Sequence, residues 1–163
     1  VRQAAGENTI LIGCATIPHL CAGLVHLGRT GADVNGKVWD ITRRMGVNTL
    51  AFRMMQHNAF FAVDADCVGI TGLFPWHYTR QWLDILAKSG TPMFVSCKPG
   101  VLSDAENEEL RQAFARNALQ RDTLIPLDWM ENICPGRWLL NGQEIAYDWF
   151  GDDVPVIFDG KSL

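Results

Sequence analysis

The sequence predicts an α/β protein in which short parallel strands alternate with helices, followed by the start of an antiparallel β-sheet. Up to about residue 126, short apolar runs bounded by Gly, Pro or Asp alternate with stretches of helical spacing. Beyond that point an Asn-Gly pair between two apolar runs indicates a β-hairpin. We therefore divide the chain into residues 1–126, a βα part, and residues 127–163, the start of a C-terminal antiparallel β domain.

Four strands are expected in the βα part. The first covers residues 9–14 and is expected to be buried on both faces, because it is a continuous apolar run. A short helical turn at 18–21 follows it. The other three strands are expected at residues 24–27, 59–63 and 92–97. Strands linked by helices in this way usually pair in parallel.

Two longer helical segments lie between these strands. Apolar spacing predicts one helix over residues 38–56, with an interruption at Gly46. Pro75 begins the other, in the favoured first turn, and Gly90 ends it. Its apolar stripe consists of Tyr78, Trp82, Ile85 and Leu86.

The last helix and the hairpin have local sequence signals. Ser103 followed by Glu106 is a capping box, which predicts that a helix begins there. Asn141-Gly142 tolerates the positive φ angles of a type I′ turn and predicts a hairpin over residues 138–147. Residues 154–158 would add a further strand.

Composition excludes several classes of protein. The net charge is −4, so a nucleic-acid partner or an anionic membrane surface is not expected. No apolar run approaches the roughly 18–20 residues that span a bilayer. The five cysteines include no C-x-x-C pair, and reduced thiols are expected. The sequence indicates no cellular compartment.

The chemistry-bearing residues follow the predicted strands, where βα loops gather. They are Cys14, Arg29 with Asp33, Asp64 with Asp66, and residues 96–98. Carboxylates that accept and cations that donate hydrogen bonds suit a hydroxyl-rich ligand. Asp33 could instead cap a loop, and the Asp64/Asp66 pair could end a strand or form the metal-binding D-x-D of a nucleotide-sugar glycosyltransferase. His19, His26, His57 and His77 lack metal-ligand spacing, so no metal and no cofactor is expected.

The order of these segments resembles the α-galactosidase-like retaining glycoside hydrolases, the melibiase group of clan D. In that family a strand ending in Gly-Cys, as at 11–14, precedes a strand ending in R-x-G-x-D, as at 29–33. The N-T-L-A-x-R segment at 48–53 is shared, and Asp64-x-Asp66-Cys67 is similar to the family's N-D-P-D segment, with Val63 and Ala65 in place of its Asn and Pro. The resemblance covers about residues 1–150. Cys97-Lys98 stands where the family commonly has an acidic pair.

The resemblance implies a partial (β/α)8 TIM barrel, in which these strands are the fifth to eighth. It implies retaining hydrolysis of terminal α-galactosides or related sugars, which needs two carboxyl groups about 5–5.5 Å apart. Asp33 falls at the family's acid/base position. Arg29 would place the sugar or orient that carboxyl, Cys14 would line the pocket, and Asp64 and Asp66 would contact the substrate.

The family's nucleophile is an Asp in a K-x-D context, and no residue of this chain matches it. A closed barrel needs about 200–250 residues, and four units would leave edge strands uncovered. We therefore expect the N-terminal half-barrel to come from a longer chain, a partner chain or a second copy, and the 163 residues to be inactive alone. The alternative is a non-catalytic carbohydrate-binding or assembly module.

Overall fold

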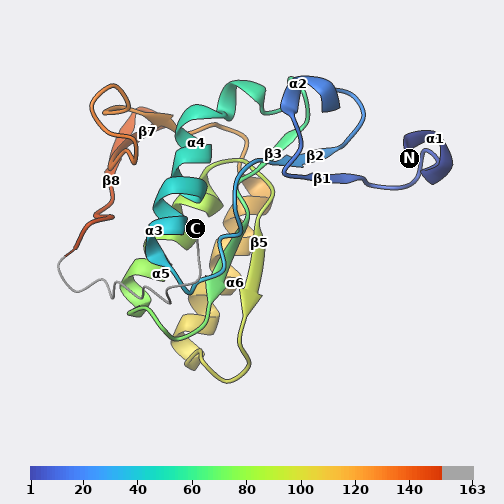
Figure 1. The fold of residues 1–163 in the computed structure, drawn as a ribbon. Helices are drawn as coiled ribbons and strands as arrows, with labels where there is room; N and C mark the ends of the chain where they lie inside the picture. The colour runs from blue at the N-terminus through green and yellow to red at the C-terminus, as the bar shows by residue number, and fades with distance from the viewer. Residues whose placement is uncertain (152–163) are drawn as a thin grey trace.

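A computed structural model of the chain describes residues 1–151 and has a mixed α/β arrangement (Figure 1). Two small sheets are parallel, one with the order β1-β2-β3 and the other formed by β4 and β5, and a third, β6-β7-β8, is antiparallel. The strands are β1 (Ile12–Cys14), β2 (Leu27–Arg29), β3 (Ala62–Asp64), β4 (Cys67–Ile70), β5 (Phe94–Cys97), β6 (Ile125–Pro126), β7 (Arg137–Leu140) and β8 (Gln143–Ala146). The predicted parallel pairing is confirmed, and all three sheets are open within the described residues.

The helices lie between the strands, as the sequence predicts. They are α1 (Arg2–Ala5), α2 (Pro18–Cys21), α3 (Trp39–Ile41), the π-helical η1 (Thr42–Val47), α4 (Asn48–Phe52), the 3-10 turn η2 (Met54–Gln56), α5 (Trp76–Lys88) and α6 (Asp104–Leu119). The Ser103 capping box is present at the start of α6. The single helix predicted over residues 38–56 is present as four segments that follow one another: α3, η1, α4 and η2.

Gly46 lies in the π-helical turn, where an interruption was predicted. A Cβ atom at Gly46 would lie 2.8 Å from the ring of Trp82 on α5. The missing side chain lets α5 approach the widened turn closely. The irregularity therefore has a packing reason.

All four predicted strands of the βα part begin later than predicted, and in β2 and β3 a local turn uses the backbone groups first. The amides of Leu24 and Val25 donate to the Cys21 carbonyl, so β2 begins only at Leu27. Residues 58–60 are likewise held in a turn after η2, and β3 begins at Ala62. In both cases a hydrogen-bonded turn replaces the first residues of the predicted strand.

The strand β4 is absent from the prediction. The chain leaves β3 at Asp64 and starts β4 at Cys67, with Asp66 between them at a φ of 69°. Asp and Asn tolerate this left-handed conformation better than most residues. The Asp-x-Asp segment, which was interpreted as the end of one strand, is therefore a sharp link between two strands in different sheets.

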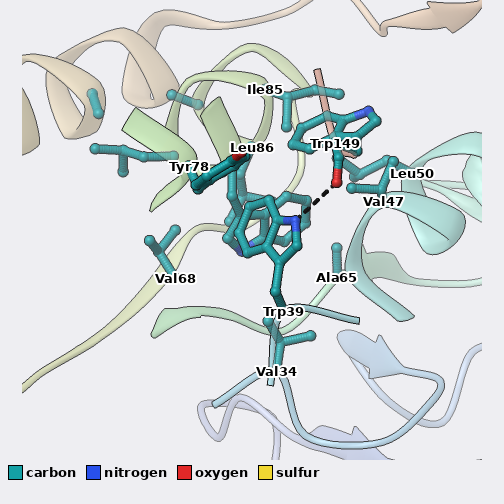
Figure 2. Close-up of a cluster of buried hydrophobic side chains, with 14 of the residues drawn as sticks. Val34, Trp39, Val47, Leu50, Ala65, Val68, Tyr78, Ile85, Leu86 and Trp149 are labelled. Atoms are coloured by element: carbon teal, nitrogen blue, oxygen red, sulfur yellow. Dashed lines mark hydrogen bonds between the residues drawn. The ribbon is translucent and has the colours of Figure 1, made fainter. Parts of the chain in front are cut away.

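The hydrophobic core lies between the α3–α4 segment, β4, α5 and the C-terminal hairpin. Figure 2 shows its indole rings and aliphatic side chains, with the Trp39 Nε1 group donating to the Trp149 carbonyl at 3.0 Å. Three indoles, those of Trp82, Trp138 and Trp149, are at most 2% exposed. The predicted stripe of α5 faces this core.

The edge of the first sheet formed by β1 is not covered by other described residues. Ile12 of β1 is 53% exposed, and Ile10, Ile17, Leu20 and Leu24 nearby are also exposed. In Figure 1, α1 and β1 extend away from the rest of the chain. The prediction that residues 9–14 are buried on both faces is wrong for the described chain, because no segment of residues 1–151 covers this edge.

The predicted hairpin is confirmed. Strands β7 and β8 pair antiparallel, and Asn141 and Gly142 between them have φ angles of 50° and 78°. Strand β6 adds a third strand to this sheet. The strand predicted at 154–158 lies outside the described residues. Across residues 1–151, no helix combines the length and apolar character needed to cross a membrane.

Candidate functional site

Five of the residues singled out from the sequence lie together at or just beyond the carboxyl ends of β1, β2 and β3. The register aligns Cys14 with Arg29, and Arg29 with Asp64, across the sheet. We call Cys14, Arg29, Asp33, Asp64 and Asp66 the Arg29 cluster. Three short strands at the same level are sufficient to bring its members together from distant parts of the sequence.

Arg29 is the centre of the cluster. Its Nη2 atom lies 2.8 Å from an Asp33 oxygen and donates to the Cys14 sulfur at 2.6 Å, while Nη1 donates to Asp66 at 2.8 Å. Burial lowers the pKa of Arg29, but the Asp66 carboxylate, with smaller contributions from Cys14 and Asp33, raises it above its ordinary value. The guanidinium is therefore a permanent cation that fixes three side chains around it.

Asp66 accepts hydrogen bonds from three donors. Its Oδ2 atom takes Arg29 Nη1 and the Val34 amide, the latter at 2.7 Å, and its Oδ1 atom takes the Cys67 amide at 2.8 Å. These bonds attach the loop after β2 to the β3–β4 link. We infer that Asp66 positions Arg29 and this loop, since its lone pairs are largely engaged within the protein.

Asp64 is buried and holds the backbone of Asp66 through a hydrogen bond. The residue is 5% exposed, and its Oδ1 atom accepts the Asp66 amide at 2.8 Å. Burial raises the pKa of Asp64, although the hydrogen bond from the Asp66 amide opposes the shift. Asp64 is not among the residues that line the adjacent cavity.

A cavity of about 550 Å³ opens beside the cluster. Its lining comes from the ends of β2, β4 and β5 and from the loop after β2. The lining residues are Arg29, Asp33, Val34, Asn35, Lys37, Asp66, Cys67, Ile70, Thr71, Ser96, Cys97 and Lys98. This volume is in the range of small-molecule sites.

Residues 33–37, which we call the Asp33 loop, pack closely on β4. Gly36 and Gly69 approach so closely that a Cβ atom on Gly36 would overlap the Gly69 carbonyl group. The Thr71 hydroxyl donates to the Gly36 carbonyl at 2.6 Å, and the Cys67 thiol donates to the Val34 carbonyl at 2.9 Å. The loop that carries Asp33 is therefore held along its length.

The Asp33 carboxylate faces solvent. Its side chain is 74% exposed, and Arg29 is its ion-pair partner. Exposure makes Asp33 accessible to a ligand in the cavity. Burial of this carboxyl group, which an acid/base residue commonly has, would have to come from groups outside residues 1–151.

Among the lining residues that were not singled out from the sequence are two polar members of the Asp33 loop, Asn35 and Lys37. Their signal was Gly36, which lies between them and whose φ of 69° marks a tight turn after the second strand. Residues 96–98 were singled out, and they line the cavity with the Arg29 cluster. Among the described residues, no group of three or more His, Cys, Asp or Glu side chains could hold a metal ion.

The fold and the site define a mixed α/β protein with a charged cluster at the carboxyl ends of parallel strands, next to a cavity. Comparison of the chain with protein-family models and with curated proteins gives no match to either. A functional proposal therefore has to depend on the geometry of the cluster and cavity, together with the order of the sequence motifs.

The cysteine thiols are expected to differ sharply in reactivity. Burial raises the pKa of Cys67 to about 11 and that of Cys134 to about 12, whereas Cys14 and Cys97 are exposed. Because the thiolate is the reactive form, iodoacetamide at pH 7.5 should label Cys14 and Cys97 and spare Cys67 and Cys134. Labelling of Cys67 should increase as the pH approaches 11.

Mass spectrometry of peptides after timed labelling measures these rates. Labelling in denaturant is the control, where Cys67 and Cys134 should react at rates close to those of the exposed thiols. Rapid modification of Cys67 in the folded protein at pH 7.5 would contradict its half-buried position at the start of β4.

Proposed function

We propose that the chain contributes to a retaining glycoside hydrolase acting on terminal α-galactosides or related sugars, with Asp33 as the acid/base. The observation that carries the proposal is the placement of Asp33 and Arg29 on a fixed loop and strand end, facing one cavity. The sequence motifs that resemble the melibiase group occur at these positions. Carboxylate and cation together suit a ligand rich in hydroxyl groups.

The proposed reaction uses Asp33 twice. In the first step its carboxyl proton goes to the glycosidic oxygen as a second carboxylate attacks the anomeric carbon. In the second step Asp33 takes a proton from water, and that water displaces the sugar from the second carboxyl group. Arg29 holds the Asp33 carboxyl group in position through both steps. Cys14 helps to place Arg29, because its sulfur accepts a hydrogen bond from the guanidinium.

The second carboxyl group is proposed to come from outside these residues. Asp66 accepts three hydrogen bonds within the protein and Asp64 is buried, so neither is arranged as a nucleophile. The exposed apolar side chains along β1 support the proposal that an N-terminal half-barrel, in the same polypeptide or a partner chain, packs there. Such a partner would also cover Asp33.

A second candidate function is a carbohydrate-binding module without catalysis. The observation that favours it is the 74% exposure of the Asp33 side chain, which leaves its carboxyl oxygens accessible to the hydroxyl groups of a sugar. In this case Asp33 would hold a hydroxyl group and donate no proton. The two candidates differ in whether the intact gene product hydrolyses the sugar it binds.

The test compares the isolated 163 residues with the intact gene product on 4-nitrophenyl α-galactoside. We expect no turnover by the isolated chain and release of nitrophenol by the intact product. Turnover by the isolated chain would contradict the external nucleophile. Binding of galactose by the intact product without hydrolysis of any α-galactoside would establish the binding module instead.

A further inference from the structure

The cavity beside the Arg29 cluster carries more positive than negative charge, although the chain has a net charge of −4. Its lining includes Arg29, Lys37 and Lys98 against Asp33 and Asp66. Both carboxylates pair with Arg29. Neither lysine has an ion-pair partner within residues 1–151, so two cations remain available to a ligand.

The backbone around each lysine is fixed. Lys37 ends the Asp33 loop, which is held on β4 by the close approach of Gly36 to Gly69. The amide of Lys98 donates to the Ile70 carbonyl at 2.8 Å and so extends the β4–β5 pairing by one residue. The two lysines therefore come to the end of β4 from different segments, one from the Asp33 loop and one from β5.

The side chains of Lys37 and Lys98 are exposed, and within residues 1–151 no carboxylate forms an ion pair with either of them. A lysine ammonium has three hydrogen-bond donors and no acceptor, and a neutral sugar hydroxyl gives it only a weak partner. A carboxylate or sulfate group is a stronger partner than a hydroxyl, because its opposite charge adds Coulomb attraction to the hydrogen bond. Ser96, next to Lys98 in the lining, adds a neutral hydroxyl donor.

We propose that the cavity binds a sugar that carries an anionic substituent, with Lys37 and Lys98 contacting the charged group. The inference rests on the proposed function for the orientation of the sugar, because the Arg29–Asp33 pair would then face the glycosidic oxygen. The substrate class becomes acidic α-glycosides, such as uronides or sulfated galactosides, in preference to neutral ones.

The test is calorimetric titration of the intact gene product at low ionic strength with galacturonic acid, galactose 6-sulfate, galactose and inorganic sulfate. We expect at least one acidic sugar to bind about tenfold or more tightly than galactose, and inorganic sulfate to bind weakly. The preference should decrease as salt is added. Galacturonic acid against galactose 6-sulfate distinguishes a ring carboxylate from a sulfate ester.

Variants locate the contact. Lys37→Gln combined with Lys98→Gln should remove most of the acidic preference and bring the affinity for the acidic sugar close to that for galactose. Lys88→Gln is the matched control, because Lys88 lies on α5 outside the cavity and pairs with Asp84. Cys97, adjacent to Lys98 in the lining, should be protected from iodoacetamide by the acidic sugar in the wild-type protein.

Equal affinity for galactose and both acidic sugars would overturn the inference, as would an unchanged preference in the double variant. Binding of sulfate alone as tightly as the acidic sugars would also overturn it, by showing a general anion site. Acidic-sugar binding without hydrolysis of any α-glycoside would contradict the proposed hydrolase activity and support the acidic-sugar site. Hydrolysis of α-galactosides without a preference for acidic sugars would support the hydrolase activity and contradict the acidic-sugar site.

Discussion

Replacing Asp33 with Asn is expected to lower the hydrolysis of galactosides with poor leaving groups by about 10²–10⁴-fold in the intact gene product. This is the usual contribution of a positioned general acid or base. An amide cannot donate a proton to the glycosidic oxygen, yet it keeps the size of the side chain and can still accept from Arg29. The aryl group of an activated galactoside can leave without being protonated. The first step of the reaction should therefore be much less affected for such a substrate.

The measurement is kcat/KM for an alkyl or disaccharide substrate beside that for an activated aryl galactoside. Asp40→Asn is the matched control, since Asp40 also pairs with arginines, at 2.7 Å from Arg43 and from Arg44, and lies outside the cavity lining. The control should retain nearly the full rate on both substrates. Equal losses on both substrates in Asp33→Asn would argue against an acid/base role and for a role in sugar binding.

Replacing Gly36 with Ala is expected to destabilise the protein by roughly 2–5 kcal/mol. A left-handed φ in a residue with a Cβ atom costs about 1–2 kcal/mol, and forcing an extra group into a packed contact adds about 1–3 kcal/mol. Gly36 has both problems, because its φ is 69° and the new Cβ atom would overlap the Gly69 carbonyl group. The obstacle is backbone, which cannot rotate away.

Urea unfolding followed by tryptophan fluorescence gives the change in the free energy of unfolding. Gly142→Ala separates the two causes, since Gly142 has a φ of 78° and open space around it. We expect that variant to lose about 1–2 kcal/mol. A loss in Gly36→Ala no greater than that in Gly142→Ala would show that the Asp33 loop is not seated on β4 as described.

Local signals predicted the elements whose structure depends on neighbouring residues. Ser103 and Glu106 satisfy the first backbone groups of α6 between themselves, and Asn141-Gly142 tolerates the positive φ angles of its turn. Neither depends on distant contacts. The apolar stripe of α5 was equally readable, because a helix with one apolar face must bury it.

Strand boundaries and burial were predicted less well, because they depend on the hydrogen bonds and backbone angles of turns and on partners elsewhere in the chain. The turn amides at Leu24 and Val25 delay β2, and the left-handed Asp66 separates β3 from β4. The exposure of Ile12 depends on whether any segment covers the edge of β1. Sequence periodicity contains none of this information.

The alternation of strands and helices, the hairpin, and the residue types at the strand ends all follow from the order of the amino acids. How those residues interact follows from the three-dimensional arrangement. It made Asp66 the acceptor that positions Arg29, buried Asp64, and brought Lys37 and Lys98 to one cavity. Each residue carries its own side-chain chemistry wherever it lies in the chain. An ion pair or a cavity instead needs groups from distant parts of the sequence, and here the parallel pairing of strands and the Gly36–Gly69 contact bring them close in space.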